Sequence, residues 1–211
     1  MAMVGDSYDP EIGWVLVPDL LSRSDLDEVR RVCVELLALP ESERRAGDKP
    51  ASGTRHLAEL DDRNDLIAAI VERERLVQVV STIVGSDAVL FQAGYRCPQP
   101  TFGGQRLHAD AAPKLADGPD VIATAIIALV DFTKTNGSTR VVPGSNRRPD
   151  LQRSSGSLER HPAEIHLIGP AGSAFVFTGH LLHAGSTNNS ADDRPALQLV
   201  WRRAQTEGPT W

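Results

Sequence analysis

The chain has 211 residues, of which 41% are hydrophobic and 24% are charged, and its formal net charge at pH 7 is -6. This length and composition predict one globular domain with a proper core. The negative charge, together with the lack of any run rich in Lys and Arg, argues against a nucleic-acid partner. The longest apolar stretch, residues 121–130, is too short to cross a membrane.

Two features predict a cytoplasmic location. Residues 1–10 are acidic and polar, and they contain neither the basic nor the apolar region of a secretory signal. The chain has two cysteines, Cys33 and Cys97, which are too few for a disulfide framework. Cys33 falls on the apolar face of a predicted helix, where a small buried hydrophobic residue is expected.

The first half of the chain is predicted to be helical after one short strand. The strand covers residues 12–17 and ends at Pro18. A helix over 24–39 follows, with Ser22 or Ser24 as its N-cap and Pro40 as its stop. Its apolar positions repeat with a helical period, at Leu26, Val29, Val32, Cys33, Leu36 and Leu37.

A polar segment separates this helix from a second one. Residues 41–54 are rich in Gly, Pro and charged residues, and we expect a loop that is a connector rather than an active-site lid. A second helix is predicted over 64–84 and is ended by Gly85. The positions expected to face inward are Leu66, Ile67, Ile70, Val77, Val80 and Val84.

After Gly85, short apolar strands alternate with Gly, Pro and Asn turns. Helices followed by many short strands predict a mainly β fold with α, a jelly roll or barrel with N-terminal helices packed outside it. We expect one domain over 1–211, with a helical part of about 1–85, a jelly-roll core of about 86–205, and a surface loop at 150–163. The expected strands are 88–95, one around Leu107, 121–132, 165–168, 173–178 and 195–203.

The segment 105–110 contains a histidine and a carboxylate two positions apart, His108 and Asp110. If this segment is extended, both side chains lie on the same face and point into one cavity. They would supply two of the three ligands of the 2-His-1-carboxylate arrangement that holds non-haem Fe(II). Alone, a His-x-Asp pair is more often a surface turn, so the hypothesis requires a second histidine.

The other histidines are His56, His161, His166, His180 and His183. The first two lie in polar segments, and the third lies in a short strand that could be buried or exposed. His180 and His183 follow the apolar strand at 174–178, where a ligand at the rim of a jelly roll would be expected. Spacing does not distinguish between these two, and a histidine beside an apolar strand is usually structural.

Arg194 lies eleven residues beyond His183 and opens the last apolar strand. A buried arginine at such a position requires an anionic partner, because an unpaired buried charge is costly. Its planar guanidinium is suited to binding a carboxylate through two hydrogen bonds. The alternative, which would be preferred for this arginine alone, is a surface salt bridge with Asp192 or Asp193.

Four segments occur in a distinctive order. They are residues 13–22, the trio His108-Ala109-Asp110, residues 131–145 with their Asn-Gly-Ser-Thr-Arg-Val-Val-Pro-Gly-Ser run, and residues 172–197 with Leu-Leu-His-Ala-Gly and Arg-Pro-Ala-Leu. The ordered set resembles the phytanoyl-CoA hydroxylase-like (PhyH) family of Fe(II)/2-oxoglutarate-dependent oxygenases, and the resemblance covers most of the chain.

The resemblance implies a fold and a metal centre. The fold is a double-stranded β-helix, a jelly roll of the cupin-like kind, with iron at one open end. The catalytic iron ligands would be His108, Asp110 and His183, so the family pattern selects His183 as the distal histidine. Fe(II), 2-oxoglutarate as co-substrate and O2 would be required.

The resemblance also implies residues for the co-substrate. The far carboxylate of 2-oxoglutarate would bind Arg194. Gln105, three residues before His108, and Thr139 match positions that contact 2-oxoglutarate in related enzymes, although Gln and Thr have many other uses. One departure is Asn146, which stands where the family usually has a histidine that is not an iron ligand. The chain is also short for the family, which implies trimmed substrate-covering loops and an open pocket.

The carboxylate of Asp110 bears on the reaction, because related halogenases have a small residue at that position. We therefore expect hydroxylation of a small molecule, in secondary metabolism. The alternatives are desaturation, cyclisation or epimerisation by an enzyme of the same fold, or a non-catalytic jelly-roll binding protein, which the intact triad and Arg194 disfavour. The sequence leaves open the substrate, the lid and the oligomeric state, a homodimer included. Residues that could face the cavity, or equally be core or surface, are Tyr95, Arg96, Trp201 and Arg203.

Overall fold

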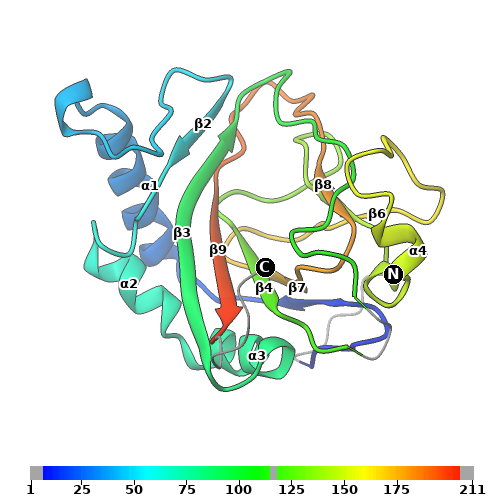
Figure 1. Ribbon diagram of the computed structural model, residues 1–211. Helices are drawn as coiled ribbons and strands as arrows, with labels where there is room; N and C mark the ends of the chain where they lie inside the picture. The colour runs from blue at the N-terminus through cyan, green and yellow to red at the C-terminus, as the bar shows by residue number, and fades with distance from the viewer. Residues whose placement is uncertain (1–6, 115–117, 205–211) are drawn as a thin grey trace.

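The computed structural model describes residues 7–114 and 118–204; residues 1–6 of the polar N-terminus and residues 115–117 and 205 of the expected core lie outside them. The described residues form two sheets, one of six strands in the order β1-β7-β4-β9-β3-β2 and one of three in the order β6-β5-β8 (Figure 1). The elements are β1 (Trp14–Val17), α1 (Arg23–Leu37), η1 (Glu41–Glu43), β2 (Thr54–Leu57), α2 (Asp65–Val71), α3 (Glu74–Val84), β3 (Ala88–Pro98), β4 (Ile122–Ala128), β5 (Thr139–Val141), η2 (Ser145–Arg147), α4 (Pro149–Gln152), β6 (Ile165–His166), β7 (Ala174–Thr178), β8 (His183–Gly185) and β9 (Ala196–Arg203).

The strand pairs of both sheets, as far as the described residues form them, are antiparallel. This pairing, with helices outside the larger sheet, is the jelly roll that the order of helices and strands predicts. The part of the chain before Gly85 is not purely helical, however, because β1 and β2 form the two edges of the six-stranded sheet. Since one sheet joins both parts of the chain, we propose that they fold as a single domain.

Side chains of the six-stranded sheet alternate between two faces, as the pleat requires. Along β9, Leu197, Leu199 and Trp201 belong to the core under the helices. Ala196 and Gln198, which alternate with these core residues, line a cavity on the opposite face. This inner face packs against residues of the smaller sheet such as Val141, so the site lies between the two sheets.

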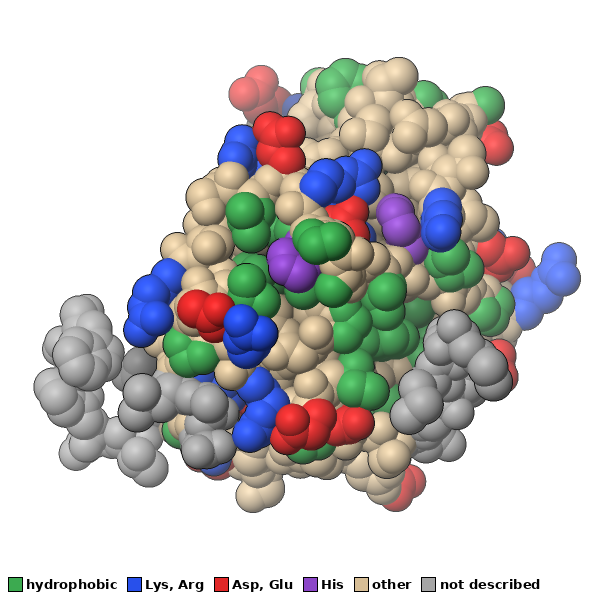
Figure 2. Space-filling model, turned by 90° about the vertical axis from the view of Figure 1, so that its right-hand side faces the viewer, with side chains coloured by type: hydrophobic (Ala, Val, Ile, Leu, Met, Phe, Trp, Pro, Cys, Tyr) green, Lys and Arg blue, Asp and Glu red, His purple; other side chains and the backbone are tan. Residues whose placement is uncertain are grey.

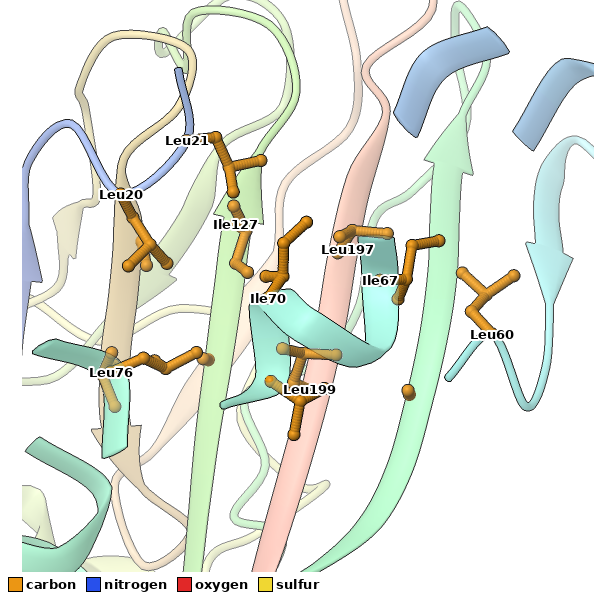
Figure 3. Packing of buried hydrophobic residues seen from close by; sticks show 14 of the residues in the cluster. Leu20, Leu21, Leu60, Ile67, Ile70, Leu76, Ile127, Leu197 and Leu199 are labelled. Carbon is orange, nitrogen blue, oxygen red and sulfur yellow. The ribbon is translucent and has the colours of Figure 1, made fainter. Parts of the chain in front are cut away.

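Helices cover the outer face of the larger sheet (Figure 1). Ile67 and Ile70 of α2 and Leu76 of α3 are fully buried, and they lie over Ile127 and Leu199 of the sheet (Figure 3). Each such side chain contributes roughly 1.5–3 kcal/mol when it is removed from water. The helical layer therefore stabilises the sheet on the side away from the site. No helix in the described part of the chain is both long enough and apolar enough to span a bilayer.

Helix α1 begins as the sequence indicates. The Ser22 side chain accepts a hydrogen bond from the backbone N–H of Asp25, whose carboxylate accepts from the Ser22 N–H, so that Ser22 rather than Ser24 is the N-cap. Leu26, Val29 and Val32 are buried as predicted. The helix ends at Leu37, two residues before the predicted end.

The helix predicted over 64–84 is two helices, α2 and α3. They are separated at Arg73, which has an extended backbone and binds the Asp25 carboxylate on α1 with its guanidinium at 2.9 Å. This ion pair, which local periodicity cannot indicate, fixes the break. The prediction that Val77 faces inward is wrong, because its side chain is exposed. Gly85 ends α3 with a φ of +100°, a conformation that favours glycine.

In the second half of the chain, the short strands and the short helix differ from those predicted. Strands β5 and β8 were not expected, and the segment around Leu107 forms only an isolated bridge, at His108. The run expected to be a strand over 121–132 ends at Ala128. The start of the expected surface loop at 150–163 is helical instead, because residues 150–152 belong to α4 (Pro149–Gln152). Strands of three residues carry too little periodicity to be recognised from sequence.

Candidate functional site

The side chains of His108, Asp110 and His183 converge at one point. Their potential ligand atoms all lie within 4.8 Å of one another. The Nε2 atoms of His108 and His183 are 3.9 Å and 3.6 Å from Oδ1 of Asp110. The structure thus brings together the two residues of the His-x-Asp motif and the distal histidine that the family resemblance implies.

Backbone pairing places the two histidines side by side. The His108 N–H donates to the carbonyl oxygen of His183 at 2.9 Å, and the His183 N–H donates to that of His108 at 2.8 Å. This two-way bridge is an antiparallel pair, and it sets the ring centroids 4.4 Å apart. A single bridge therefore creates the spatial pair from residues 75 positions apart in the sequence.

Hydrogen bonds fix which nitrogen of each ring is available. Nδ1 of His108 lies 2.9 Å from the carbonyl oxygen of Arg106, and Nδ1 of His183 lies 2.9 Å from that of Leu181. A carbonyl only accepts, so each Nδ1 carries a proton and each Nε2 keeps its lone pair for a metal. Burial lowers the pKa of His183 below its usual value, which keeps the imidazole in the neutral form that binds metals.

Asp110 is oriented by a residue of the larger sheet. The hydroxyl of Thr124 on β4 donates to Oδ2 of Asp110 at 3.0 Å, which leaves Oδ1 facing the two histidines. Gly179 makes room beside it, because a Cβ there would lie 3.5 Å from the Asp110 Cβ and only 2.6 Å from that of Ile122. Two imidazole nitrogens and one carboxylate oxygen are the donor set of a facial Fe(II) site, so these residues fit that metal.

Thr124→Val should weaken Fe(II) binding by about 10–100-fold, the usual effect of removing a hydrogen bond to a ligating carboxylate. Valine has nearly the same shape, so the sheet should stay intact. The measurement is anaerobic Fe(II) titration, with Thr82→Val on the exposed side of α3 as the matched control. Equal Fe(II) affinity in wild type and Thr124→Val would show that Asp110 does not depend on this hydroxyl.

A cavity of about 50 Å³ opens beside the histidines on the inner face of the large sheet. Its wall includes all the residues expected for the co-substrate together with both histidines: Gln105, His108, Thr139, His183 and Arg194. The face seen in Figure 2, the side of β6, β8 and α4, shows histidine side chains among hydrophobic side chains and charges of both signs. The sequence-predicted site residues therefore meet in one place.

Arg194 is buried, with 3% of its surface exposed. Its guanidinium stacks on the ring of Phe132, 4.7 Å from the centroid. Burial, with a smaller contribution from the nearby Arg96, lowers the pKa of Arg194 to about 10. Within residues 7–114 and 118–204, Arg194 forms no ion pair and its buried Nε has no hydrogen-bond partner.

The alternative role of Arg194, a surface salt bridge, is not observed among the described residues. Asp193 pairs instead with Arg55, at 3.1 Å. Arg194 also precedes its strand rather than opening it, since β9 begins at Ala196 and the Arg194 N–H donates to the carbonyl oxygen of Pro98. A buried, unpaired guanidinium in the wall of a cavity fits an anionic ligand such as the far carboxylate of 2-oxoglutarate.

Gln105 and Thr139 line the same cavity. The Gln105 side-chain oxygen accepts from the N–H of Gly185 at 2.9 Å, and the Gln105 carbonyl oxygen accepts from Arg140 at 2.8 Å. Thr139 is buried at the start of β5, opposite Gly185. The Gln105 amide is thus anchored through its oxygen, which orients its nitrogen for a ligand.

The remaining histidines lie outside the cluster. His56 is on β2 rather than in a loop, and Nδ1 of His166 lies 3.0 Å from the Ser138 hydroxyl. His180 is buried with its Nδ1 3.1 Å from the carbonyl oxygen of Ala112. Asn146, at the family's histidine position, is buried and donates to the carbonyl oxygen of Pro10, which ties η2 to the chain before β1.

Of the four residues that could have faced the cavity, only Arg96 does. Tyr95 and Trp201 belong to the core under the helices, and Arg203 is exposed at the end of β9. Sequence reasoning did not identify Thr124 or Phe177, whose ring centroid lies 4.7 Å from that of His183. The sequence offered one indication of a role for Thr124, which is that it is a polar residue inside an apolar strand.

Comparisons with known proteins agree on one family. Residues 11–196 match the model of the phytanoyl-CoA dioxygenase (PhyH) family. L-proline trans-4-hydroxylase of Streptomyces griseoviridis is 28% identical over 223 residues, covering 90% of this chain and 82% of that protein. The Fe(II)/2-oxoglutarate-dependent dioxygenase nvfF of Aspergillus novofumigatus is 40% identical over 98 residues, which cover 44% of this chain and 31% of that protein.

Among solved structures, the crystal structure of SnoN, a non-heme alpha-ketoglutarate-dependent epimerase from nogalamycin biosynthesis, is similar with a TM-score of 0.73. The match covers 92% of this chain and 80% of that one, at 23% sequence identity. At this identity the likeness bears on the fold, and it agrees with the jelly roll described above.

Proposed function

Because the chain belongs to the phytanoyl-CoA dioxygenase family and is an Fe(II)/2-oxoglutarate-dependent dioxygenase, we propose that it hydroxylates a C–H bond of a small molecule. In this proposal His108, Asp110 and His183 hold the iron. Arg194 binds the far carboxylate of 2-oxoglutarate, assisted by Gln105 and Thr139. The observation that carries it is the convergence of two free Nε2 atoms and one carboxylate oxygen beside a buried, unpaired arginine.

His108, Asp110 and His183 would hold the metal, and the neighbouring cavity would receive 2-oxoglutarate. Bound Fe(II) and 2-oxoglutarate supply the oxidising chemistry, in which 2-oxoglutarate is converted to succinate and CO2. The chain supplies orientation and electrostatics. Thr124 holds the Asp110 carboxylate, and backbone carbonyls hold both imidazoles in the tautomer that binds metal.

Apolar side chains around the site limit the access of water. Phe177 lies against His183, and Ile126 lines the cavity beside it. Phe132 lies under the guanidinium of Arg194, where a less polar surrounding strengthens the attraction of the arginine for a carboxylate. These residues favour reaction of a bound substrate over unproductive turnover.

The test is a succinate-release assay with a small-molecule panel, followed by the mass of each product. L-proline is a reasonable first compound, because a relative is named for its hydroxylation. Hydroxylation adds one oxygen atom derived from O2, desaturation or cyclisation removes two hydrogens, and epimerisation leaves the mass unchanged. A product without added oxygen would replace hydroxylation with one of these outcomes. Failure to bind iron and to release succinate would support a binding protein instead.

We also propose a cytoplasmic location and a small-molecule partner. Cys33 and Cys97 are both buried and free, as expected in a reducing compartment. Secondary metabolism is the proposed setting.

A further inference from the structure

Arg96 is a second arginine in the cavity wall. Its neighbours on β3, Tyr95 and Cys97, belong to the core under the helices, so the alternation of the strand directs Arg96 to the inner face. It lines the cavity together with His183 and Arg194. The wall therefore carries two guanidinium groups, of which the co-substrate assignment uses one.

In the described part of the chain, no acidic side chain compensates the charge of Arg96. Among residues 7–114 and 118–204, Arg96 takes part in no ion pair, and burial lowers its pKa without an opposing contribution from a carboxylate. Its positive charge also lowers the pKa values of Arg194 and His183, so the three groups lie within electrostatic reach of one another. Keeping two unpaired cations in one cavity is costly unless anions bind there.

Formal charges show that the site, with Fe(II) and 2-oxoglutarate bound, would lack one negative charge. With both imidazoles neutral, Fe(II), the Asp110 carboxylate, doubly charged 2-oxoglutarate and Arg194 together sum to zero. Arg96 then leaves one positive charge in a partly buried site. One more anionic group restores neutrality, and neither carboxylate of 2-oxoglutarate is left to provide it.

Strand register places Arg96 and Gln198 at diagonal positions of two adjacent strands on the inner face. Arg194 pairs with Pro98 through its N–H, Arg96 is opposite Ala196, and Gln198 is opposite Gly94. Diagonal positions of two adjacent strands are roughly 7–8 Å apart, which long side chains can span. Gln198 also lines the cavity, and Gly94 opposite it has no side chain to fill the space.

We propose that Arg96, with Gln198 beside it, binds a carboxylate of the organic substrate, so that this dioxygenase acts on small organic acids. The inference rests on the proposed function and names its substrate class. Arg96 would fix one end of the substrate through two charge-assisted hydrogen bonds, and the Gln198 amide would add a donor. A neutral substrate would leave Arg96 uncompensated, so the site selects against it.

The experiment is anaerobic calorimetric titration of the Fe(II)·2-oxoglutarate holoenzyme with propionate, benzoate and N-acetylglycine, each compared with its primary amide. Acids should bind at least about tenfold more tightly than the amides. Arg96→Gln should remove this preference while the affinity for 2-oxoglutarate changes by less than about threefold, and Arg96→Lys should restore it in part. Arg55→Gln, at an arginine paired with Asp193 outside the cavity, is the matched control and should keep the preference.

Three results would overturn the inference. They are equal binding of acids and amides, binding of none of the acids by the wild type, and a loss of 2-oxoglutarate affinity in Arg96→Gln as large as in Arg194→Gln. The last result would make Arg96 a second co-substrate residue. Thermal melting and iron content establish that each variant is folded. Fe(II) and 2-oxoglutarate titrations of the wild type come first, so a failure of the proposed function is recognised separately.

Discussion

Asp110→Ala should abolish Fe(II) binding, whereas the wild type should bind about one Fe(II) per chain, as one facial triad requires. Asp110 supplies the only carboxylate of the convergent cluster found in the described residues, and its Oδ1 lies within 3.9 Å of both histidine Nε2 atoms. Loss of a direct ligand should exceed the 10–100-fold effect of losing a partner of a ligand. Anaerobic titration and metal analysis measure the change.

His183→Ala should have the same effect, and His180→Ala is the informative control. His180 is also buried, lies three residues away, and has an Nε2 without a hydrogen-bond partner. It stays outside the cluster because its ring is held at the carbonyl oxygen of Ala112. Abolished iron binding in His180→Ala, with intact binding in His183→Ala, would show that the distal assignment is wrong.

Arg194→Ala should weaken 2-oxoglutarate binding by about thirty-fold to several-thousand-fold, equivalent to roughly 2–5 kcal/mol for breaking a desolvated, hydrogen-bonded charge pair. The buried guanidinium has no anionic partner among the described residues, so its attraction for a carboxylate is not already satisfied. The measurement is anaerobic titration of the Fe(II) protein with 2-oxoglutarate, followed by charge-transfer absorption.

Three comparisons make the Arg194 result specific. Arg194→Lys should restore binding only in part, because an ammonium cannot reproduce the planar guanidinium. Fe(II) affinity should be nearly unchanged. The ligand-free variant should melt at or above the wild-type temperature, because a buried charge without a partner has been removed. Arg55→Ala is the control, and wild-type 2-oxoglutarate affinity in Arg194→Ala would require a different anchor for the co-substrate.

Local sequence was sufficient to predict much of the helical layer outside the larger sheet. The serine cap, the apolar period of α1 and the glycine after α3 act within a few residues, so they can be recognised without a structure. The break between α2 and α3 at Arg73 could not be recognised from local sequence, because it depends on Asp25, which lies 48 residues away. The exposure of Val77 follows from the same break, since α3 starts with its own helical phase.

The residues of the site can also be divided into those that the sequence indicated and those that it left open. The sequence by itself determined the His-x-Asp pair, since two ligands on one extended segment share a face whatever the rest of the chain does. The choice of His183 and Arg194 as partners of that pair came instead from the resemblance of four ordered segments to the PhyH family. Left to spacing alone, His180 and His183 were equivalent, and Arg194 was better explained by its acidic neighbours.

Only the tertiary structure decided how these residues meet. The bridge between His108 and His183, the hydroxyl of Thr124 on Asp110, and the isolation of Arg194 from Asp193 all arise from chain segments distant in sequence. The location of Arg96 is likewise decided by the tertiary structure, because the sequence of its strand is compatible with a place in the core, on the surface or in the cavity wall. Which face of a strand becomes the inner one depends on where the helices pack, and that contact is made only when the sheet has assembled.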